Sequence, residues 1–92
     1  MEKNEFISKI RDLGTVESVT GIIYRIDSVN NNYVIGTRLS THKEFKIETD
    51  GLYQAYCDIS KEKIPMTTPA LRDYVTRTQS PALAIIKSLR KL

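Results

Sequence analysis

The sequence predicts an α+β fold: an N-terminal helix, a three-stranded antiparallel β-meander, then three C-terminal helices including a short helical hairpin. Apolar residues recur at helical spacing within residues 2–13. Residues 18–48 instead contain a stretch rich in β-branched and aromatic residues and two stretches that alternate apolar and polar side chains, separated by turn residues. From Asp50 onward the apolar period returns to that of a helix. The length of 92 residues indicates a single small domain, residues 1–92.

Residues 2–13 are expected to form an amphipathic helix. Phe6, Ile10 and Leu13 fall on one face, and Gly14 follows as a stop signal. The opposite face is polar and charged, so the helix needs an apolar surface to cover. The apolar face of the predicted sheet is the expected partner.

Three strands are expected over residues 18–26, 33–39 and 44–48. The first stretch is rich in β-branched and aromatic residues, which favour strands. Residues 27–32 contain Asp, Ser and three Asn, which are typical of a turn. The second and third stretches alternate apolar and polar residues on either side of a short turn at residues 40–42. Short turns between successive strands indicate an antiparallel meander.

Three helices are expected after the sheet, the first over residues 50–59. The pattern Ser/Thr-Pro-Ala-Leu then occurs twice, starting at Thr68 and at Ser80. A hydroxyl side chain suits the N-cap position, and proline suits the first helical turn because its missing N–H needs no partner there. Thr68 and Ser80 are therefore predicted to be N-caps, with Pro69 and Pro81 as the first helical residues.

Positive charge is concentrated near the C-terminal end of the chain. Residues 61–92 hold seven basic and two acidic side chains, whereas residues 1–60 hold seven basic and nine acidic ones. A basic end on a near-neutral body favours an anionic partner such as nucleic acid. The alternative is a solvated helix end whose Lys and Arg side chains offset the helix dipole.

The two short helices predicted after Thr68 resemble a helix-turn-helix unit. The sequence departs from that pattern by placing Arg72 where a small residue is usual and by lacking glycine in the turn. The resemblance implies a DNA-binding module without enzymatic activity, in which the second helix meets base edges and flanking cations meet phosphates. The candidate nucleic-acid-binding residues are Arg72, Arg77, Gln79, Lys87, Arg90 and Lys91, with Ser80 and Ala84 also near the bases.

Other functions stay open from the sequence. One is a protein-interaction or self-associating domain, such as a homodimer, without a nucleic-acid role. Asp27, Glu44 and Lys46 also resemble the core of metal-dependent nucleases, where carboxylates hold Mg²⁺ and lysine orients the attacking water. The Glu-Phe-Lys pattern is equally typical of a half-exposed strand. The helix–strands–helix order of residues 2–59 is similar to that of double-stranded-RNA-binding domains, without the basic cluster at the start of their second helix.

No cofactor, metal ion or small-molecule substrate is indicated by the sequence. His42 lies in a polar turn, and Cys57 has no second cysteine to pair with. No apolar run approaches the roughly 20 residues that span a bilayer, and the N-terminus lacks the apolar core of a secretory signal. We therefore expect no membrane partner and a cytoplasmic location.

Overall fold

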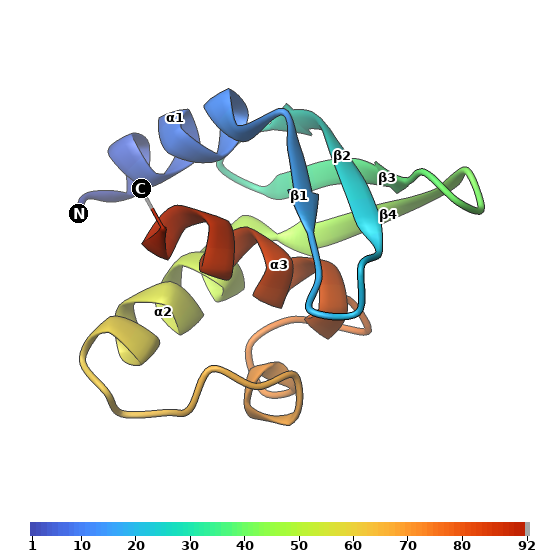
Figure 1. Cartoon of the computed structure of the whole chain (residues 1–92). Coiled ribbons are helices and arrows are strands. Elements are labelled where there is room, and N and C mark those ends of the chain that lie inside the picture. The colour runs from blue at the N-terminus through green and yellow to red at the C-terminus, as the bar shows by residue number, and fades with distance from the viewer. Residues whose placement is uncertain (92) are drawn as a thin grey trace.

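The structure, a computed structural model that describes residues 1–91, contains a four-stranded antiparallel sheet and three α-helices (Figure 1). The predicted α+β class is confirmed. The strands follow one another in the sheet in chain order. The elements are α1 (Lys3–Leu13), β1 (Thr15–Glu17), β2 (Ile23–Val29), β3 (Tyr33–Arg38), β4 (Lys43–Glu48), α2 (Thr49–Ser60), the 3₁₀ turn η1 (Pro69–Leu71) and α3 (Gln79–Arg90).

The prediction of one strand over residues 18–26 is wrong. The chain instead forms a hairpin of two strands, β1 and β2, with the turn at residues 18–22. The amide of Ser18 donates to the carbonyl of Ile22, and Gly21 has a φ of 87°, which glycine adopts without steric cost. The β-branched residues on both sides of this turn favour a strand, which is why the sequence did not predict the turn. The meander has four strands rather than three.

The asparagine-rich turn predicted over residues 27–32 is shorter than expected. The β2 strand continues to Val29, with a register shift around Asp27. The Asn30 side chain organises the reversal, because its Oδ1 accepts hydrogen bonds from the amides of Asn32 and Tyr33, both at 2.8 Å.

The helix predicted to start after Thr68 does not form, and the predicted helical hairpin is therefore absent. The chain makes only the 3₁₀ turn η1, without a side-chain cap from Thr68, and then an irregular segment up to α3. The Tyr74 hydroxyl donates to Asp58 of α2 at 2.7 Å, which holds this segment along α2. Arg77 has a φ of 58°, a left-handed conformation that no α-helix continues through.

The last helix, α3, begins earlier than predicted. Gln79 rather than Pro81 is its first residue, so Pro81 occupies the third position. An N–H at that position has no intrahelical acceptor, so proline, which has no N–H, costs no hydrogen bond there. Ser80 is not the N-cap. Its hydroxyl lies 2.9 Å from the Tyr24 hydroxyl and connects the start of α3 to the sheet.

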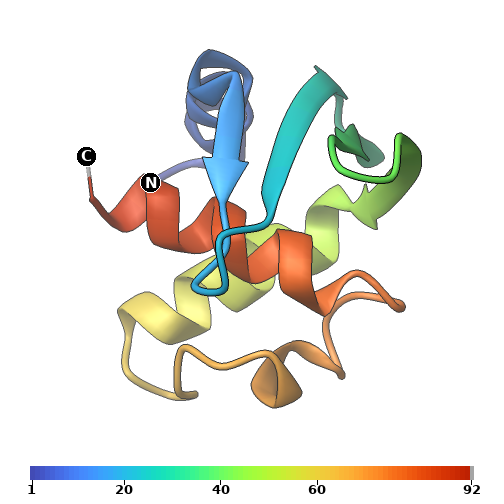
Figure 2. The same cartoon turned by 45° about the vertical axis from the view of Figure 1, so that its right-hand side comes forward.

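The centre of the hydrophobic core is α3. Figure 2 shows it running between the sheet and α1 on one side and α2 with the following connector on the other. The rings of Tyr53 and Tyr56 in α2 lie 5.1 and 5.3 Å from that of Phe6, so the predicted apolar face of α1 packs against a helix as well as the sheet. In residues 1–91 no helix is both long and apolar enough to cross a membrane. The buried residues of α3 are Pro81, Ala82, Leu83, Ala84, Ile85, Ile86 and Leu89.

Candidate anion-binding surfaces around α3

The predicted nucleic-acid-binding residues lie in three different places around α3. Three of them gather at its C-terminal end, two border a small hollow beside η1, and one lies in the turn before the helix. The structure thus brings together only half of the predicted set. These groups are Lys87, Arg90 and Lys91; Arg72 and Gln79; and Arg77 alone.

The helix-turn-helix interpretation is not supported by this arrangement. A recognition helix must expose its first turns, whereas Ala84, predicted to lie near bases, is only 1% exposed. The first helix of the expected pair is also missing. The six consecutive apolar residues 81–86 are the sequence signal that α3 is surrounded by the core on most sides.

A groove runs beside the C-terminal half of α3, and we refer to it as the α3 groove. One wall is the β1–β2 turn, the other is the connector after α2, and the volume is about 450 Å³. Two further hollows share lining residues with it, so the depression continues toward both ends of the helix. Its lining residues are Glu17, Ser18, Val19, Met66, Lys87, Ser88, Arg90 and Lys91.

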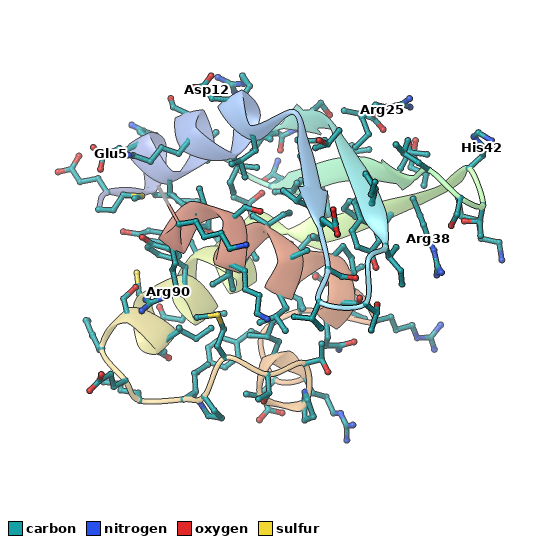
Figure 3. All side chains as sticks on the ribbon, in the orientation of Figure 1. Glu5, Asp12, Arg25, Arg38, His42 and Arg90 are labelled. Carbon is teal, nitrogen blue, oxygen red and sulfur yellow. The ribbon has the colours of Figure 1, made fainter. Side chains whose placement is uncertain are left out.

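Positive charge dominates the α3 groove. Lys87, Arg90 and Lys91 face one carboxylate, that of Glu17. Within residues 1–91 none of these three cations forms an ion pair, and Arg90 only donates a hydrogen bond to Ser60 Oγ at 3.3 Å. Figure 3 shows Arg90 on the side of α3 that faces α2. Three cations without carboxylate partners are available to an anionic ligand.

A second hollow lies at the N-terminal end of α3, and we refer to it as the N-terminal hollow. Its volume is about 380 Å³. Arg38 projects from the sheet toward the side on which α3 lies (Figure 3). Sequence reasoning missed Arg38 and Lys43, because the β3–β4 hairpin is far from Arg77 along the chain and no local spacing links them. The lining residues are Tyr24, Arg38, Thr41, Lys43, Glu44, Phe45, Arg77, Thr78, Ser80 and Pro81.

The residues of the nuclease alternative each make separate contacts. Asp27 accepts hydrogen bonds from Thr37 Oγ1 and Arg25 Nε, both at 2.6 Å, and the Thr37 bond foremost holds the pKa of Asp27 below its ordinary value. Lys46 Nζ lies 4.2 Å from the centre of the Tyr33 ring. Glu44 borders the N-terminal hollow. Among the described residues, no three His, Cys, Asp or Glu side chains are grouped so as to hold a metal ion.

Comparison of the chain with protein-family models, with curated protein sequences and with solved structures finds no match in any of the three.

Proposed function

We propose that this chain is a non-enzymatic module that binds single-stranded nucleic acid, with the phosphates held in the α3 groove. The observation that carries the proposal is the meeting of Lys87, Arg90 and Lys91 in one groove with a single carboxylate. The proposal includes a cytoplasmic location, which the lone cysteine supports because a free thiol persists in a reducing compartment.

The charge at this end of α3 exceeds what the helix itself requires. A helix C-terminus carries a partial charge of roughly −0.5, which nearby cations offset. The groove holds three full positive charges against the carboxylate of Glu17. The surplus is available for phosphates, whose counterions are released when Lys and Arg side chains replace them.

The shape of the groove favours a single strand over a duplex. A helix that reads duplex DNA enters the major groove, which is roughly 12 Å wide and admits little beyond one helix. Here α3 is flanked by the β1–β2 turn and by the connector after α2, and its residues 81–86 are buried. An extended strand fits between such walls, with cations along its backbone and apolar side chains such as Val19 and Met66 beside its bases.

The test is a fluorescence-anisotropy titration at low salt with a labelled 12-nucleotide single strand and the matching duplex. Charge reversal at three groove residues (Lys87→Glu, Arg90→Glu, Lys91→Glu) is expected to weaken single-strand binding at least tenfold. The matched control reverses three cations outside the groove (Lys9→Glu, Lys46→Glu, Arg72→Glu), which changes the net charge equally. Equal losses in both variants, or no binding by the unmodified protein, would overturn the proposal.

Self-association is the competing function, and one observation favours it. Val19 and Ile23, at the tip of the β1–β2 hairpin, are 73% and 43% exposed. Large apolar side chains that a small protein leaves exposed are candidates for an interface when they form a patch. If the chain self-associates, sedimentation equilibrium is expected to detect a dimer. The double variant Val19→Ser, Ile23→Ser should then be monomeric, whereas the triple charge reversal in the α3 groove should still form the dimer.

A further inference from the structure

The N-terminal hollow lies at the opposite end of α3 from the three groove cations and takes no part in the proposed function. Three cations, Arg38, Lys43 and Arg77, border it together with one carboxylate, Glu44. None of these four side chains forms an ion pair within residues 1–91. Arg38 Nε donates a hydrogen bond to Ser40 Oγ at 3.2 Å. The hollow therefore carries a surplus of positive charge that no carboxylate of residues 1–91 pairs with.

The start of α3 adds backbone donors to this charge. The amides of Gln79 and Ser80 donate no hydrogen bond in residues 1–91, as expected for the first residues of a helix. A helix of this length, 12 residues, also presents the positive end of its dipole here. Free amides and a positive dipole end together favour an anion.

An unsatisfied hydroxyl is a second, independent feature of the hollow. Thr78 lines the hollow and is 9% exposed, and its buried Oγ1 has no hydrogen-bond partner in residues 1–91. A threonine in this position normally accepts the amide of the second or third helical residue. The third residue here is Pro81, which has no N–H. Buried polar atoms in native proteins are nearly always paired, and this hydroxyl, which is closed to solvent in the free protein, is a donor that a ligand oxygen would satisfy on binding.

Part of the hollow is apolar. The rings of Tyr24 and Phe45 meet edge to face with their centres 5.5 Å apart, and Pro81 lies on the same lining. The Phe45 ring occupies the space over Gly36, where a side chain on residue 36 would collide with it. An aromatic surface beside a cationic one suits a ligand that has a flat apolar part next to its anionic group.

We infer that the N-terminal hollow is a binding site for a phosphate monoester with a flat ring, of which a mononucleotide is the simplest example. The guanidinium groups of Arg38 and Arg77 present the paired donors that phosphate oxygens accept, and Lys43 adds a third charge. The volume of about 380 Å³ falls within the range of small-molecule sites. Glu44 is an acceptor for a sugar hydroxyl and disfavours a second phosphate group.

The experiment is an NMR titration of the ¹⁵N-labelled protein with inorganic phosphate and, separately, with AMP. Both are expected to shift the amide signals of Gln79 and Ser80, and AMP is expected to bind at least tenfold more tightly and to shift the Phe45 ring signals as well. Equal affinities for the two probes would overturn the inference that a ring is recognised. Absence of shifts at Gln79 and Ser80 at millimolar AMP would overturn the site itself.

Variants separate this site from the α3 groove. Arg38→Gln and Arg77→Gln are each expected to weaken AMP binding at least tenfold, while Lys87→Gln leaves it unchanged. Amide spectra that otherwise match the unmodified protein establish that the variants are folded. A loss of AMP binding in Lys87→Gln equal to that in Arg77→Gln would place AMP in the α3 groove and overturn the inference.

Discussion

Gly51 lies directly against the backbone of Tyr74. A Cβ added to Gly51 would stand far closer than 3.0 Å to the Tyr74 carbonyl oxygen. Only glycine therefore lets the segment after η1 lie on the first turn of α2. The Tyr74 hydroxyl bonds to Asp58 in the last turns of the same helix, so Tyr74 is fixed to α2 at both its backbone and its side chain.

The first prediction concerns Gly51→Ala. Alanine in a helix interior is favoured over glycine by about 0.5–1 kcal/mol. Overpacking against a neighbour that cannot move typically costs about 1–3 kcal/mol, and a backbone carbonyl yields less than a side chain. The variant is therefore expected to lose about 1–2 kcal/mol of unfolding free energy, measured as a lower urea midpoint at constant m-value.

A control for this substitution is Ser8→Ala, at an exposed position of α1 where no neighbour restricts a methyl group. It should change the free energy of unfolding by less than about 0.5 kcal/mol. A Gly51→Ala protein as stable as the unmodified one would show that the segment after η1 does not lie on α2.

The second prediction is a pH dependence of stability that Tyr74→Phe removes. The hydrogen bond from Tyr74 is the main reason why the pKa of Asp58 lies below its ordinary value of 3.8. The unfolded chain then takes up a proton before the folded one, so this contribution to stability is present above pH 4 and is lost as the pH falls through the lowered pKa. The same bond foremost raises the pKa of Tyr74 above 10.0, so its contribution is present below pH 10 and is lost at higher pH.

Urea denaturation of both proteins across acidic, neutral and alkaline pH measures this effect. The stability difference between the unmodified protein and Tyr74→Phe should be largest near neutral pH and shrink toward both extremes. A difference that is constant with pH would show that the Tyr74–Asp58 bond is not formed in solution. Tyr33→Phe is the control, because the Tyr33 hydroxyl donates no hydrogen bond to a carboxylate in residues 1–91.

Local patterns in the sequence were sufficient for most elements of the fold. The apolar spacing predicted α1 and α2, and the alternation predicted β3 and β4, to within a few residues. The turn at Gly21 was missed because the residues around it are β-branched and favour a strand wherever they lie. The chain after η1 was predicted as a helix because Thr68 and Pro69 suit a helix start, whereas its structure is set by contacts with Gly51 and Asp58, which precede it by many residues.

The candidate sites also differ in whether neighbouring residues in the sequence or contacts between distant segments define them. The six candidate nucleic-acid-binding residues were predicted as one set because they lie in or beside the predicted C-terminal helices, and the structure brings together only Lys87 and Arg90, in the last turns of α3, with Lys91 at its C-cap. The N-terminal hollow was not predicted, because its cations come from the β3–β4 hairpin and from the turn before α3. Only the packing of α3 against the sheet brings Arg38 and Arg77 to one hollow.

The third prediction concerns Thr78→Val, which replaces a buried, unpaired hydroxyl with a methyl group of similar size. An unsatisfied buried polar group costs about 1–3 kcal/mol, so the variant is expected to gain about 1 kcal/mol in unfolding free energy without ligand. In the presence of saturating AMP the gain should shrink, because a ligand oxygen accepts a hydrogen bond from the Thr78 hydroxyl in the unmodified protein. Thermal unfolding with and without AMP measures both values, and a loss of stability in the free protein would show that the hydroxyl is already paired.

The fourth prediction concerns Arg77→Gly. Arg77 has a φ of 58°, and the left-handed conformation costs a non-glycine residue roughly 1–2 kcal/mol. Glycine removes that cost but loses more chain entropy on folding, so a net gain of about 0.5–1 kcal/mol is expected. Affinity for AMP should fall at the same time, because the guanidinium group is removed.

A matched control for this change exists in the same chain. Glu62 follows α2 with a φ of 59° and lies outside the N-terminal hollow. Glu62→Gly should raise stability by a similar amount and leave the affinity for AMP unchanged. If Arg77→Gly gained stability and kept its affinity for AMP, the Arg77 side chain would have no role in the hollow.

The fifth prediction is the salt dependence of single-strand binding in the α3 groove. Each phosphate neutralised on a single strand contributes a slope of about −0.7 to the logarithm of affinity against the logarithm of salt concentration. Lys87, Arg90 and Lys91 together should therefore give a slope of about −2, and Lys87→Gln should reduce its magnitude by about 0.7. Arg72→Gln, which removes a cation beside η1, should leave the slope unchanged. Anisotropy titrations at four or more salt concentrations yield these slopes, and a slope that falls equally in both variants would mean that the strand does not follow the groove.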